Sequence, residues 1–412
     1  MQAVIMAGGK GTRVASVNNA VPKPMLSICG KPVLQHQIEC LKRQGITKIT
    51  LAIGHLGEQI SGYFGDGRKF GVNIDYIKEE EPLGTAGALF YLKGKAGGDF
   101  LLINGDLIFD IDFHRLMEFH KTHKAMATLL AHPNDHPGDS GILLADSDDR
   151  VTGWLAKEEE RSWYHNCVNA GVHVLSPKIL EKMDSPTKID LDREILKPLI
   201  PTGEIFVYRS PEYVKDMGTP ERIAQVEHDL ETGLVGRKSL SRKQRAVFLD
   251  RDGTINRYVG FLRKPGEFEL LDGVAEAVQR INQSGYLAIV VTNQPVIARG
   301  EVTWEGLDEI HCKMETLLGQ RGAYLDDIFV CPHHPDKGFP GERPEYKIDC
   351  DCRKPGPGML LQAAEKYNIG LAESWMIGDS QRDEAAGKAA GCQTMLLGEN
   401  KGLLDAVKRL GF

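Results

Sequence analysis

The sequence predicts two α/β domains, each built on a mainly parallel sheet. The chain has 412 residues, whereas one domain usually has roughly 100 to 200. Apolar runs typical of buried strands alternate with helical patterns in both halves. One such run opens each half, AVIMAG from Ala3 and AVFLD from Ala246. The basic, polar stretch 231–245 between them reads as a solvated linker.

Each half contains four of these strand-like runs. In the first half we expect strands at residues 3–8, 46–54, 99–106 and 167–175. In the second half we expect them at residues 246–250, 285–293, 326–331 and 374–379. The predicted domains are therefore residues 1–230 and 246–412. Ligands of parallel sheets bind beyond the carboxyl ends of the strands, and glycines and acidic residues follow several of these runs.

Composition excludes several classes of protein. With 50 basic and 57 acidic residues the net charge is -7, which argues against nucleic-acid or membrane-surface binding through a global positive field. No apolar run reaches the ~18 residues of a membrane span, and no basic region precedes the first apolar run. We therefore expect a cytoplasmic protein whose eight cysteines are reduced thiols or metal ligands.

The first strand run leads directly into AGGKGTR, residues 7–13. Glycines allow the backbone to turn tightly and bring N–H donors close to a phosphate, and an arginine adds a charged fork. In VPKPM, Lys23 lies between two prolines that stiffen its loop. These features predict an anion site with Gly8, Gly9, Gly11, Thr12, Arg13 and Lys23.

The motif AGGKGTR followed by PKPM resembles the signature of the sugar-1-phosphate nucleotidyltransferases. LGTAGAL, NGDL, NAGVHVL and KDMGTPERI follow in the family's order, so the resemblance covers about 230 residues and implies a Rossmann-like fold. It implies catalytic roles for Arg13 and Lys23. It also implies base contacts at Gly84, Thr85 and Gly87, sugar contacts at Asn169 and Gly171, and Mg²⁺ ligands at Asp106 and Asp216.

One sugar contact departs from the family pattern. The family often has a Glu-Lys pair after the next strand, and Lys157 can be matched to its lysine. The preceding residue is Ala156, so Glu158 is the substitute for the acidic contact.

In the second half, AVFLDRDGTIN places Asp250 and Asp252 just beyond a buried strand. One carboxylate can attack phosphorus while the other gives and takes a proton. The motif resembles the first motif of the haloacid-dehalogenase-like phosphatases, which form an aspartyl-phosphate. The resemblance implies phosphoryl contacts at Thr292, Asn293 and Arg353, a neutralising Lys354, and Mg²⁺ at Asp250, Asp252 and Asp379. Asp383 is either a nearby site residue or a solvated helix-start charge.

Two short motifs, CPHHP and CDC, bring together ligands that suit zinc. Cys331, His333, Cys350 and Cys352 supply three thiolates and one imidazole, a closed tetrahedral set typical of structural Zn²⁺. His334 is the competing nitrogen ligand. Two thiol pairs without a metal are the alternative.

The spacing of the phosphatase motifs leaves no room for a large cap domain. A cap-less chain with CxH and CxC is similar to the D-glycero-D-manno-heptose-1,7-bisphosphate 7-phosphatases. Pro295 and Val296 stand where those relatives tend to carry Ser-Gly, which removes an N–H donor. Histidinol phosphatases share the zinc motif and are the nearest rival.

The combination of the two halves favours heptose activation. A heptose bisphosphatase makes a sugar 1-phosphate that a nucleotidyltransferase consumes. The expected small-molecule partners are heptose 1,7-bisphosphate, heptose 1-phosphate and GTP, with GDP-heptose as product for lipopolysaccharide or S-layer glycan synthesis. GTP is implied by the resemblance of the first half to heptose- and mannose-1-phosphate guanylyltransferases, and the residues do not exclude adenine, thymine or cytosine as the base. A homo-oligomer is left open. The alternatives are a mannose- or hexose-1-phosphate transferase joined to a histidinol-phosphate-like phosphatase, and a domain that only senses sugar phosphates.

Overall fold

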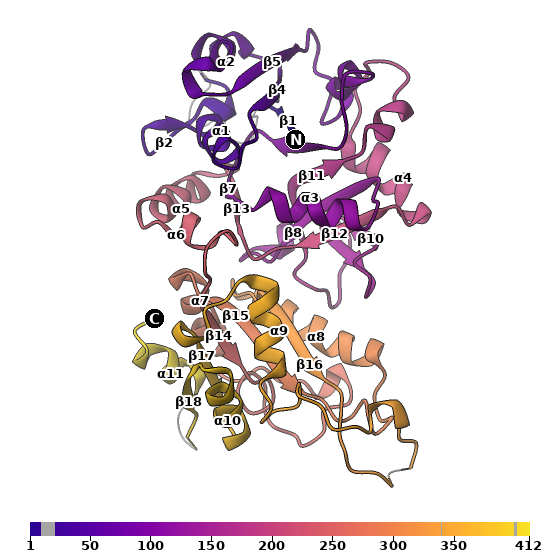
Figure 1. Ribbon diagram of the computed structural model, residues 1–412, viewed down its shortest axis with the longest axis vertical. Helices are drawn as coiled ribbons and strands as arrows, with labels where there is room; N and C mark the ends of the chain where they lie inside the picture. The colour runs from indigo at the N-terminus through magenta and orange to yellow at the C-terminus, as the bar shows by residue number, and fades with distance from the viewer. Residues whose placement is uncertain (10–20, 339, 399–401) are drawn as a thin grey trace. The chain divides into compact units, whose positions relative to one another are not determined.

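The computed structural model describes residues 1–9, 21–338, 340–398 and 402–412. This part of the chain divides into two compact units (Figure 1). The first contains residues 1–132, 143–155 and 169–239, and the second contains residues 133–142, 156–168 and 240–412. The predicted order of two domains is confirmed, but the first is not continuous, because 133–142 and 156–168 group with the second unit.

The sheet of the first unit has the order β10-β9-β11-β6-β1-β4-β5, with β8 and β12 joined through β11. Strands β6, β1, β4 and β5 run parallel, whereas β11 is antiparallel to β6. The strands are β1 (Gln2–Met6), β4 (Lys48–Ile53), β5 (Asn73–Lys78), β6 (Phe100–Asn104), β8 (Ala127–His132), β9 (Ile142–Ala145), β10 (Val151–Leu155), β11 (Val168–Leu175) and β12 (Ile205–Arg209). The four strands expected in this half are all present.

Smaller elements complete the first unit. Strand β7 (Leu107–Asp110) pairs antiparallel with β13 (Tyr213–Asp216), and β2 (Ser27–Ile28) pairs with β3 (Lys31–Pro32). The helices are α1 (Val33–Arg43), α2 (Gly57–Phe64), α3 (Phe113–Thr122), α4 (Lys197–Leu199), α5 (Pro220–Glu231) and α6 (Leu234–Arg237). The short helical turns are η1 (Lys23–Met25), η2 (Arg68–Phe70), η3 (Gly87–Leu92), η5 (Pro177–Lys182), η6 (Leu191–Leu196) and η7 (Ile200–Thr202).

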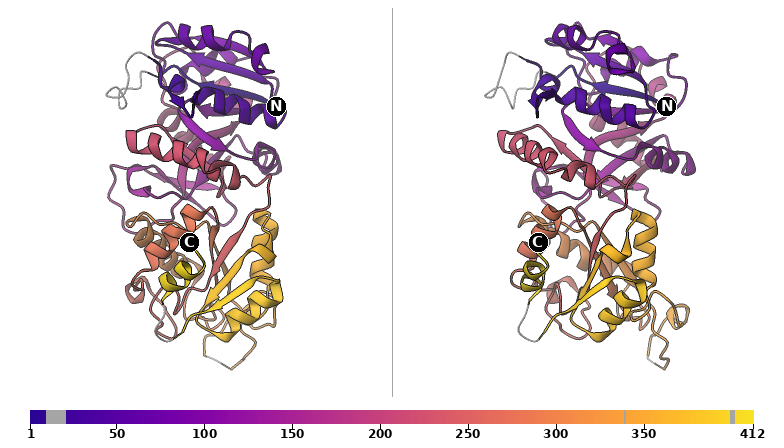
Figure 2. Two further views of the ribbon diagram at one scale, coloured as in Figure 1. Left: turned by 90° about the vertical axis from the view of Figure 1, so that its left-hand side faces the viewer. Right: turned by 60° about the vertical axis from the view of Figure 1, so that its left-hand side comes forward.

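The second unit is a parallel sheet in the order β16-β15-β14-β17-β18. Helices cover both of its faces (Figure 2). The strands are β14 (Ala246–Leu249), β15 (Leu287–Asn293), β16 (Asp327–Cys331), β17 (Trp375–Gly378) and β18 (Gln393–Leu396). The helices and turns are α7 (Val274–Ser284), α8 (Trp304–Gly319), α9 (Gly358–Tyr367), α10 (Gln381–Ala390), α11 (Leu403–Arg409), η4 (Pro137–Asp139), η8 (Pro265–Glu267), η9 (Pro344–Tyr346) and η10 (Leu371–Glu373).

The central strand β14 shows why this half reads as an uninterrupted apolar run. Val247 and Leu249 pack with α7, α8 and α11 on one face, and Ala246 and Phe248 pack with α9 and α10 on the other. Because successive side chains of a strand point to opposite faces, a sheet covered on both sides needs apolar residues at every position. The next residue, Asp250, is the first that leaves the core.

The segment 231–245, predicted to be a solvated linker, is only partly exposed. Leu234 and Val235 of α6 are buried in the first unit, and Lys238 is 3% exposed. Gln244 is 1% exposed, and its backbone bonds to Asn368 and Gly370 of the second unit. The many basic residues made this segment look solvated in the sequence, whereas apolar side chains and backbone hydrogen bonds hold it to the folded units. We propose that the domain boundary lies near residue 240.

Candidate active sites

The strand end after β14 carries a buried group of two acids and one lysine. The Asp250 backbone N–H donates to the Ile377 carbonyl at 3.0 Å, which continues the ladder and fixes the position of its side chain. Lys354 Nζ lies 2.6 Å from Asp250 Oδ1 and 2.6 Å from Asp383 Oδ1. The side chains of Lys354 and Asp383 are 3% and 2% exposed. Asp383 is therefore buried and not a solvated charge, although it also caps the start of α10 through hydrogen bonds from Ser380; its role in the site stays a prediction.

Asp252 is surrounded by hydrogen-bond donors. Arg251, which is fully buried, donates to both of its carboxylate oxygens at 3.0 and 2.8 Å. Asn256 Nδ2 donates to Oδ1 at 3.0 Å, and Gln294 Nε2 donates to Oδ2 at 2.8 Å. These bonds hold the carboxylate in one orientation, which suits a group that exchanges a proton with the substrate. Arg251, Asn256 and Gln294 were missed, although DRDGTIN and TNQ contain them.

Three carboxylates form the candidate magnesium site of this unit. Oxygens of Asp250, Asp379 and Asp383 all lie within 4.8 Å of one another. A hard cation such as Mg²⁺ prefers carboxylate oxygens, so these residues fit it. The predicted ligand set was Asp250, Asp252 and Asp379. The Asp252 carboxylate oxygens accept hydrogen bonds from Arg251, Asn256 and Gln294, and Asp252 stays a predicted ligand.

Gly253 explains how Asp379 comes so close to the first motif. Its φ is +87°, and a Cβ at this position would collide with the Asp379 carboxylate. A glycine accepts this backbone conformation without strain, and because it has no Cβ it leaves room for the carboxylate. The glycine of the DxDGT motif therefore admits Asp379 to the site.

Burial and charge shift the pKa values of Asp250, Lys354 and Asp379. Burial raises the pKa of Asp250 to about 6, and the nearby Lys354 ammonium opposes the rise. Burial works against a charged Lys354, but the carboxylates of Asp250 and Asp383 outweigh it and raise the Lys354 pKa. Burial also raises the pKa of Asp379. Desolvated acids beside a buried cation are typical of a reactive site.

The other residues predicted to bind phosphate each form hydrogen bonds with groups of the protein itself. Thr292 is 1% exposed, and its hydroxyl accepts a bond from Gln294 at 2.8 Å. Asn293 holds the Lys354 backbone, since it accepts from its N–H and donates to its carbonyl, both at 3.0 Å. Arg353 donates to the His333 carbonyl at 3.0 Å. Asn293 thus positions the Lys354 peptide, and phosphate binding by these three residues stays a prediction.

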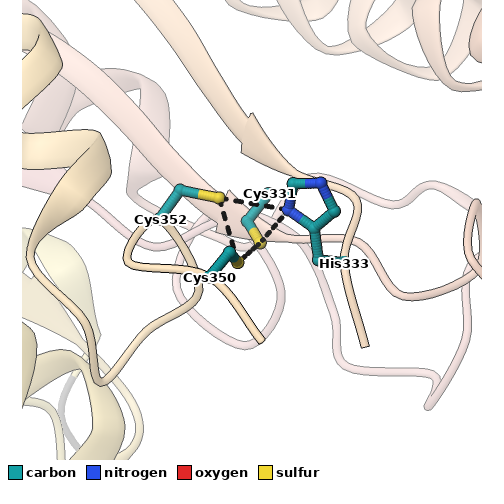
Figure 3. Close-up of side chains that lie close together, drawn as sticks. All are labelled: Cys331, His333, Cys350 and Cys352. Carbon is teal, nitrogen blue, oxygen red and sulfur yellow. Dashed lines mark hydrogen bonds between the residues drawn. The ribbon is translucent and has the colours of Figure 1, made fainter. Parts of the chain in front are cut away.

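The four predicted zinc ligands converge, as Figure 3 shows. Cys331 Sγ lies 3.6 Å from Cys350 Sγ, Cys352 Sγ lies 3.3 Å from Cys350 Sγ, and His333 Nδ1 lies 3.3 Å from Cys352 Sγ. A hydrogen bond from Cys331 lowers the pKa of Cys352 to about 5, which favours the thiolate that binds metals.

His334 does not take part in this cluster. Its Nδ1 instead accepts a hydrogen bond from the Asp336 backbone at 3.2 Å. Donor type and separation fit a closed Cys₃His site for Zn²⁺, with His333 as the nitrogen ligand.

In the first unit, the paired strands β7 and β13 bring the two predicted magnesium ligands to neighbouring positions. Asp216 is in register with Leu107, and the Met217 N–H donates to the Asp106 carbonyl at 3.0 Å. The Lys23 ammonium forms an ion pair with Asp106. Arg222 binds both oxygens of Asp216, at 3.0 and 2.8 Å. A cation at these two aspartates would therefore replace existing ion pairs.

The glycines assigned to the base pack against their own chain. Gly84 has φ +77°, and a Cβ there would collide with the Ile189 carbonyl. A Cβ on Gly87 would collide with the Thr187 carbonyl. The Thr85 hydroxyl accepts the Leu191 N–H at 2.7 Å. These residues shape the loop through contacts with 187–191, and their contact with a base stays a prediction.

The predicted sugar residues are only partly brought together. Asn169 Oδ1 accepts the Gly171 N–H at 3.2 Å, and a Cβ on Gly171 would collide with the Asn104 amide at the end of β6. Lys157 is exposed, pairs with Glu158 at 3.9 Å, and belongs to the segment that groups with the second unit. The structure therefore gives no support to Lys157 as a sugar ligand. The predicted contacts Gly11, Thr12 and Arg13 lie outside the described residues.

Glu79, just after β5, is a candidate site residue that the motifs did not reveal. Its backbone N–H donates to the Ile53 carbonyl at 2.8 Å, and a Cβ on Gly8 would collide with its carboxylate. Its Oε1 is buried without a hydrogen-bond partner among the described residues, and burial raises its pKa. A buried acceptor without a partner costs free energy unless a ligand satisfies it. The only signal in the sequence is the acidic run EEEP, which reads as a solvated turn.

Comparison with known proteins agrees with this geometry. Residues 2–233, more than half of the chain, match the family model described as nucleotidyl transferase. The chain belongs to the nucleotidyl transferase family. Mannose-1-phosphate guanylyltransferase of Mycobacterium tuberculosis is 32% identical to this family member over 61% of the chain and 70% of the relative. The crystal structure of HddC from Yersinia pseudotuberculosis is 28% identical and covers 56% of the chain and 99% of its own, with a TM-score of 0.50.

This nucleotidyl transferase also carries a haloacid-dehalogenase-like phosphatase domain. Residues 351–409 match the family model described as HAD-hydrolase-like. D-glycero-beta-D-manno-heptose-1,7-bisphosphate 7-phosphatase of Pasteurella multocida is 44% identical over 37% of the chain and 81% of the relative. Among the described residues, no helix is both long enough and apolar enough to cross a membrane.

Proposed function

We propose that this enzyme makes an activated heptose in two steps. The phosphatase domain removes the 7-phosphate of D-glycero-D-manno-heptose 1,7-bisphosphate, and the transferase domain joins the resulting 1-phosphate to GMP from GTP, with release of pyrophosphate. The observation that carries the proposal is the Asp250, Lys354 and Asp383 cluster in a chain that also holds the transferase motifs. One named relative, a heptose-1,7-bisphosphate 7-phosphatase, supports the bisphosphate substrate, and another, a mannose-1-phosphate guanylyltransferase, supports guanylyl transfer to a sugar 1-phosphate.

In the phosphatase step, an Asp250 oxygen attacks phosphorus and forms an aspartyl-phosphate. Asp252 gives its proton to the sugar oxygen that leaves, and then takes a proton from the water that hydrolyses the acyl phosphate. Lys354 neutralises the nucleophile and the phosphoryl group, and Asp383 holds Lys354 in place through their 2.6 Å contact. Gln294 bonds to both Asp252 and Thr292, so it keeps the acid-base group next to the phosphoryl position.

Metal ions have separate roles in this proposal. Mg²⁺ held by Asp250 and Asp379, with the Asp383 carboxylate beside them, would neutralise phosphate charge and orient the phosphoryl group. Zn²⁺ held by Cys331, His333, Cys350 and Cys352 would tie down the loop between β16 and η9, a structural role.

In the transferase step, the sugar phosphate attacks the α-phosphorus of the nucleotide. Two anions meet, so catalysis depends mostly on alignment and neutralisation of charge. Lys23 supplies a cation on η1, whose position the flanking prolines restrict. Mg²⁺ at Asp106 and Asp216 would balance the charge of the leaving pyrophosphate.

The choice of GTP rests on Glu79. A carboxylate only accepts hydrogen bonds, and guanine offers two adjacent donors, N1–H and the N2 amino group. Adenine, cytosine, uracil and thymine each offer at most one donor position on that edge, flanked by an acceptor. The Glu79 Oε1, which is buried and has no hydrogen-bond partner in the part of the chain that the structure describes, therefore suits a donor of guanine.

Substitution of Glu79 by glutamine tests the base assignment. The amide adds a donor that faces the donors of guanine, so we expect kcat/KM for GTP to fall by about 5- to 150-fold, as about one to three kcal/mol per lost bidentate pair implies. Glu80→Gln is the matched control, since Glu80 is exposed, and it should leave the GTP rate unchanged. Equal GTP rates in wild type and Glu79→Gln would exclude Glu79 as the guanine contact.

The order of the two steps can be read by phosphorus NMR. The protein is incubated with the 1,7-bisphosphate, Mg²⁺ and each nucleoside triphosphate in turn. We expect loss of the 7-phosphate signal first, and then a sugar diphosphate signal with GTP alone. Orthophosphate without any nucleotide sugar would mean that the transferase uses another sugar or anomer. Absence of orthophosphate would favour histidinol phosphate as the phosphatase substrate.

A further inference from the structure

Residues 156–168 and helix α8 form a cluster of nitrogen, oxygen and sulfur ligands that neither reaction uses. One ligand atom each from His165, Asp308 and Cys312 lies within 4.8 Å of the other two. Both segments belong to the second compact unit. The sequence motifs give no hint of this cluster, because His165 is separated from Asp308 by 143 residues.

Helix geometry aims two of the ligands at the same point. Asp308 and Cys312 are four residues apart on α8, so both side chains lie on one face of the helix. Asp308 Oδ2 lies 3.9 Å from Cys312 Sγ, and Asp308 Oδ1 lies 2.9 Å from His165 Nε2. The donor set of imidazole, carboxylate and thiol is therefore assembled around Nε2 of His165.

The second ring nitrogen of His165 already has the partner that metal-bound histidines use. Its Nδ1 is hydrogen-bonded to Glu315, whose side chain is 11% exposed. Histidines that bind metals through one nitrogen typically donate the other N–H to a carboxylate, which fixes the ring and its tautomer. Asp308, with a side chain 62% exposed, leaves a path from solvent to the site.

We propose that His165 Nε2, Asp308 and Cys312 bind a zinc-class divalent cation, with Glu315 as the outer carboxylate. A thiolate combined with an imidazole favours Zn²⁺ over the harder Mg²⁺ and Ca²⁺. Three protein ligands leave the fourth tetrahedral position to water. The cation would fasten residues 156–168 to α8. The alternative is a plain ion pair in which a protonated His165 bridges two carboxylates and the Cys312 thiol takes no part.

Zinc counting on the full-length protein separates these two arrangements. Wild type and variants are dialysed against buffered micromolar Zn²⁺ and measured by atomic mass spectrometry, with circular dichroism as a check of folding. The test compares variants with wild type, so it does not depend on occupancy of the Cys331 cluster. We expect His165→Gln and Cys312→Ser each to bind about one ion fewer per chain than wild type. Cys29→Ser removes an exposed thiol and should bind as much as wild type.

Two further measurements make the result decisive. Cobalt substitution should give a thiolate-to-metal absorption band whose intensity falls in Cys312→Ser and not in Cys29→Ser. Glu315→Gln should keep the ion but weaken its affinity by about 10- to 100-fold, as expected for an outer partner. Equal zinc content in wild type, His165→Gln and Cys312→Ser would overturn the proposal and leave the ion-pair arrangement.

Discussion

The two catalytic centres differ in how completely the protein assembles them. In the phosphatase domain, Lys354 and Asp383 are nearly inaccessible, and Lys354 forms ion pairs with both Asp383 and Asp250. In the transferase domain, the side chains of Lys23 and Asp106 are 16% and 31% exposed, and that of Asp216 is 35% exposed. One centre is a packed, charged core, and the other is a more open set of ion pairs.

This difference follows from which reacting groups the protein itself must supply and position in each reaction. The aspartyl-phosphate chemistry needs a nucleophile and an acid-base group that belong to the protein, so the fold can fix them before the substrate arrives. In nucleotidyl transfer both reacting groups come with the substrates, so the protein supplies charge that pairs again when ligand and metal bind. The contacts of Lys23 with Asp106 and of Arg222 with Asp216 are the pairs that would exchange.

The largest expected effect is the loss of the phosphatase nucleophile. Asp250→Asn should lower phosphatase kcat/KM by at least about 10³-fold, because an amide cannot form the acyl phosphate. Orthophosphate release and pyrophosphate release are measured in the same sample. Pyrophosphate release from added heptose 1-phosphate and GTP should stay at the wild-type rate. Loss of both activities would show that the two centres are not independent.

The difference in burial predicts a difference in stability between two lysine variants. Lys354→Met leaves Asp250 and Asp383 buried without their cation, so unfolding of the phosphatase domain should lose about 3 to 5 kcal/mol. Lys23→Met removes the partner of a partly exposed acid and should cost less than about 1 kcal/mol, while it cripples pyrophosphate release. Calorimetry measures the destabilisation caused by each variant, and the phosphatase and transferase assays measure the loss of activity. Similar destabilisation by both variants would remove the distinction between a packed and an open centre.

The raised pKa of Asp250 predicts a pH limit for the phosphatase. The nucleophile must be ionised, and burial raises its pKa to about 6. At low Mg²⁺, kcat/KM should therefore fall about tenfold for each pH unit below about 6. More Mg²⁺ should move this limb to lower pH, because the cation competes with the proton for the same oxygens. If the pH at which kcat/KM falls does not change with the Mg²⁺ concentration, the titration belongs to another group.

His173 of β11 predicts a smaller acid effect, on the stability of the transferase domain. Complete burial lowers its pKa from 6.5 to about 4, so the unfolded chain binds a proton in this range that the folded chain does not. Its contribution is intact above pH ~6.5 and declines as the pH falls towards ~4, by about 1.4 kcal/mol at pH ~5.5.

Denaturant unfolding at pH ~7.5 and ~5.5 measures this effect. His173→Leu should lose this part of the pH dependence, and His114→Leu, which changes an exposed histidine, should keep it. The same pH dependence in wild type and His173→Leu would assign the effect to another group.

Local patterns were enough to predict most strands and the ends that carry the chemistry. Apolar runs at 246–250 and 285–293 became β14 and β15, since buried parallel strands need apolar residues on both faces. The four zinc ligands were also predicted and do converge. The partial burial of the linker was not predicted, because basic side chains at 237–245 are visible in a sequence and the burial of their backbone is not.

By itself, the sequence determined the two domain types and the order of their motifs, and it predicted Asp250, Asp252, Lys354 and Lys23 as site residues. These depend on short stretches that fold into strand ends and turns. Only the tertiary structure decided that Asp383 pairs with Lys354, that Asp252 is surrounded by donors, and that Glu79 is a buried acceptor. Lys354 and Asp250 are 104 residues apart. Such contacts and the burial that shifts their pKa values arise from packing between distant segments, which no local pattern records.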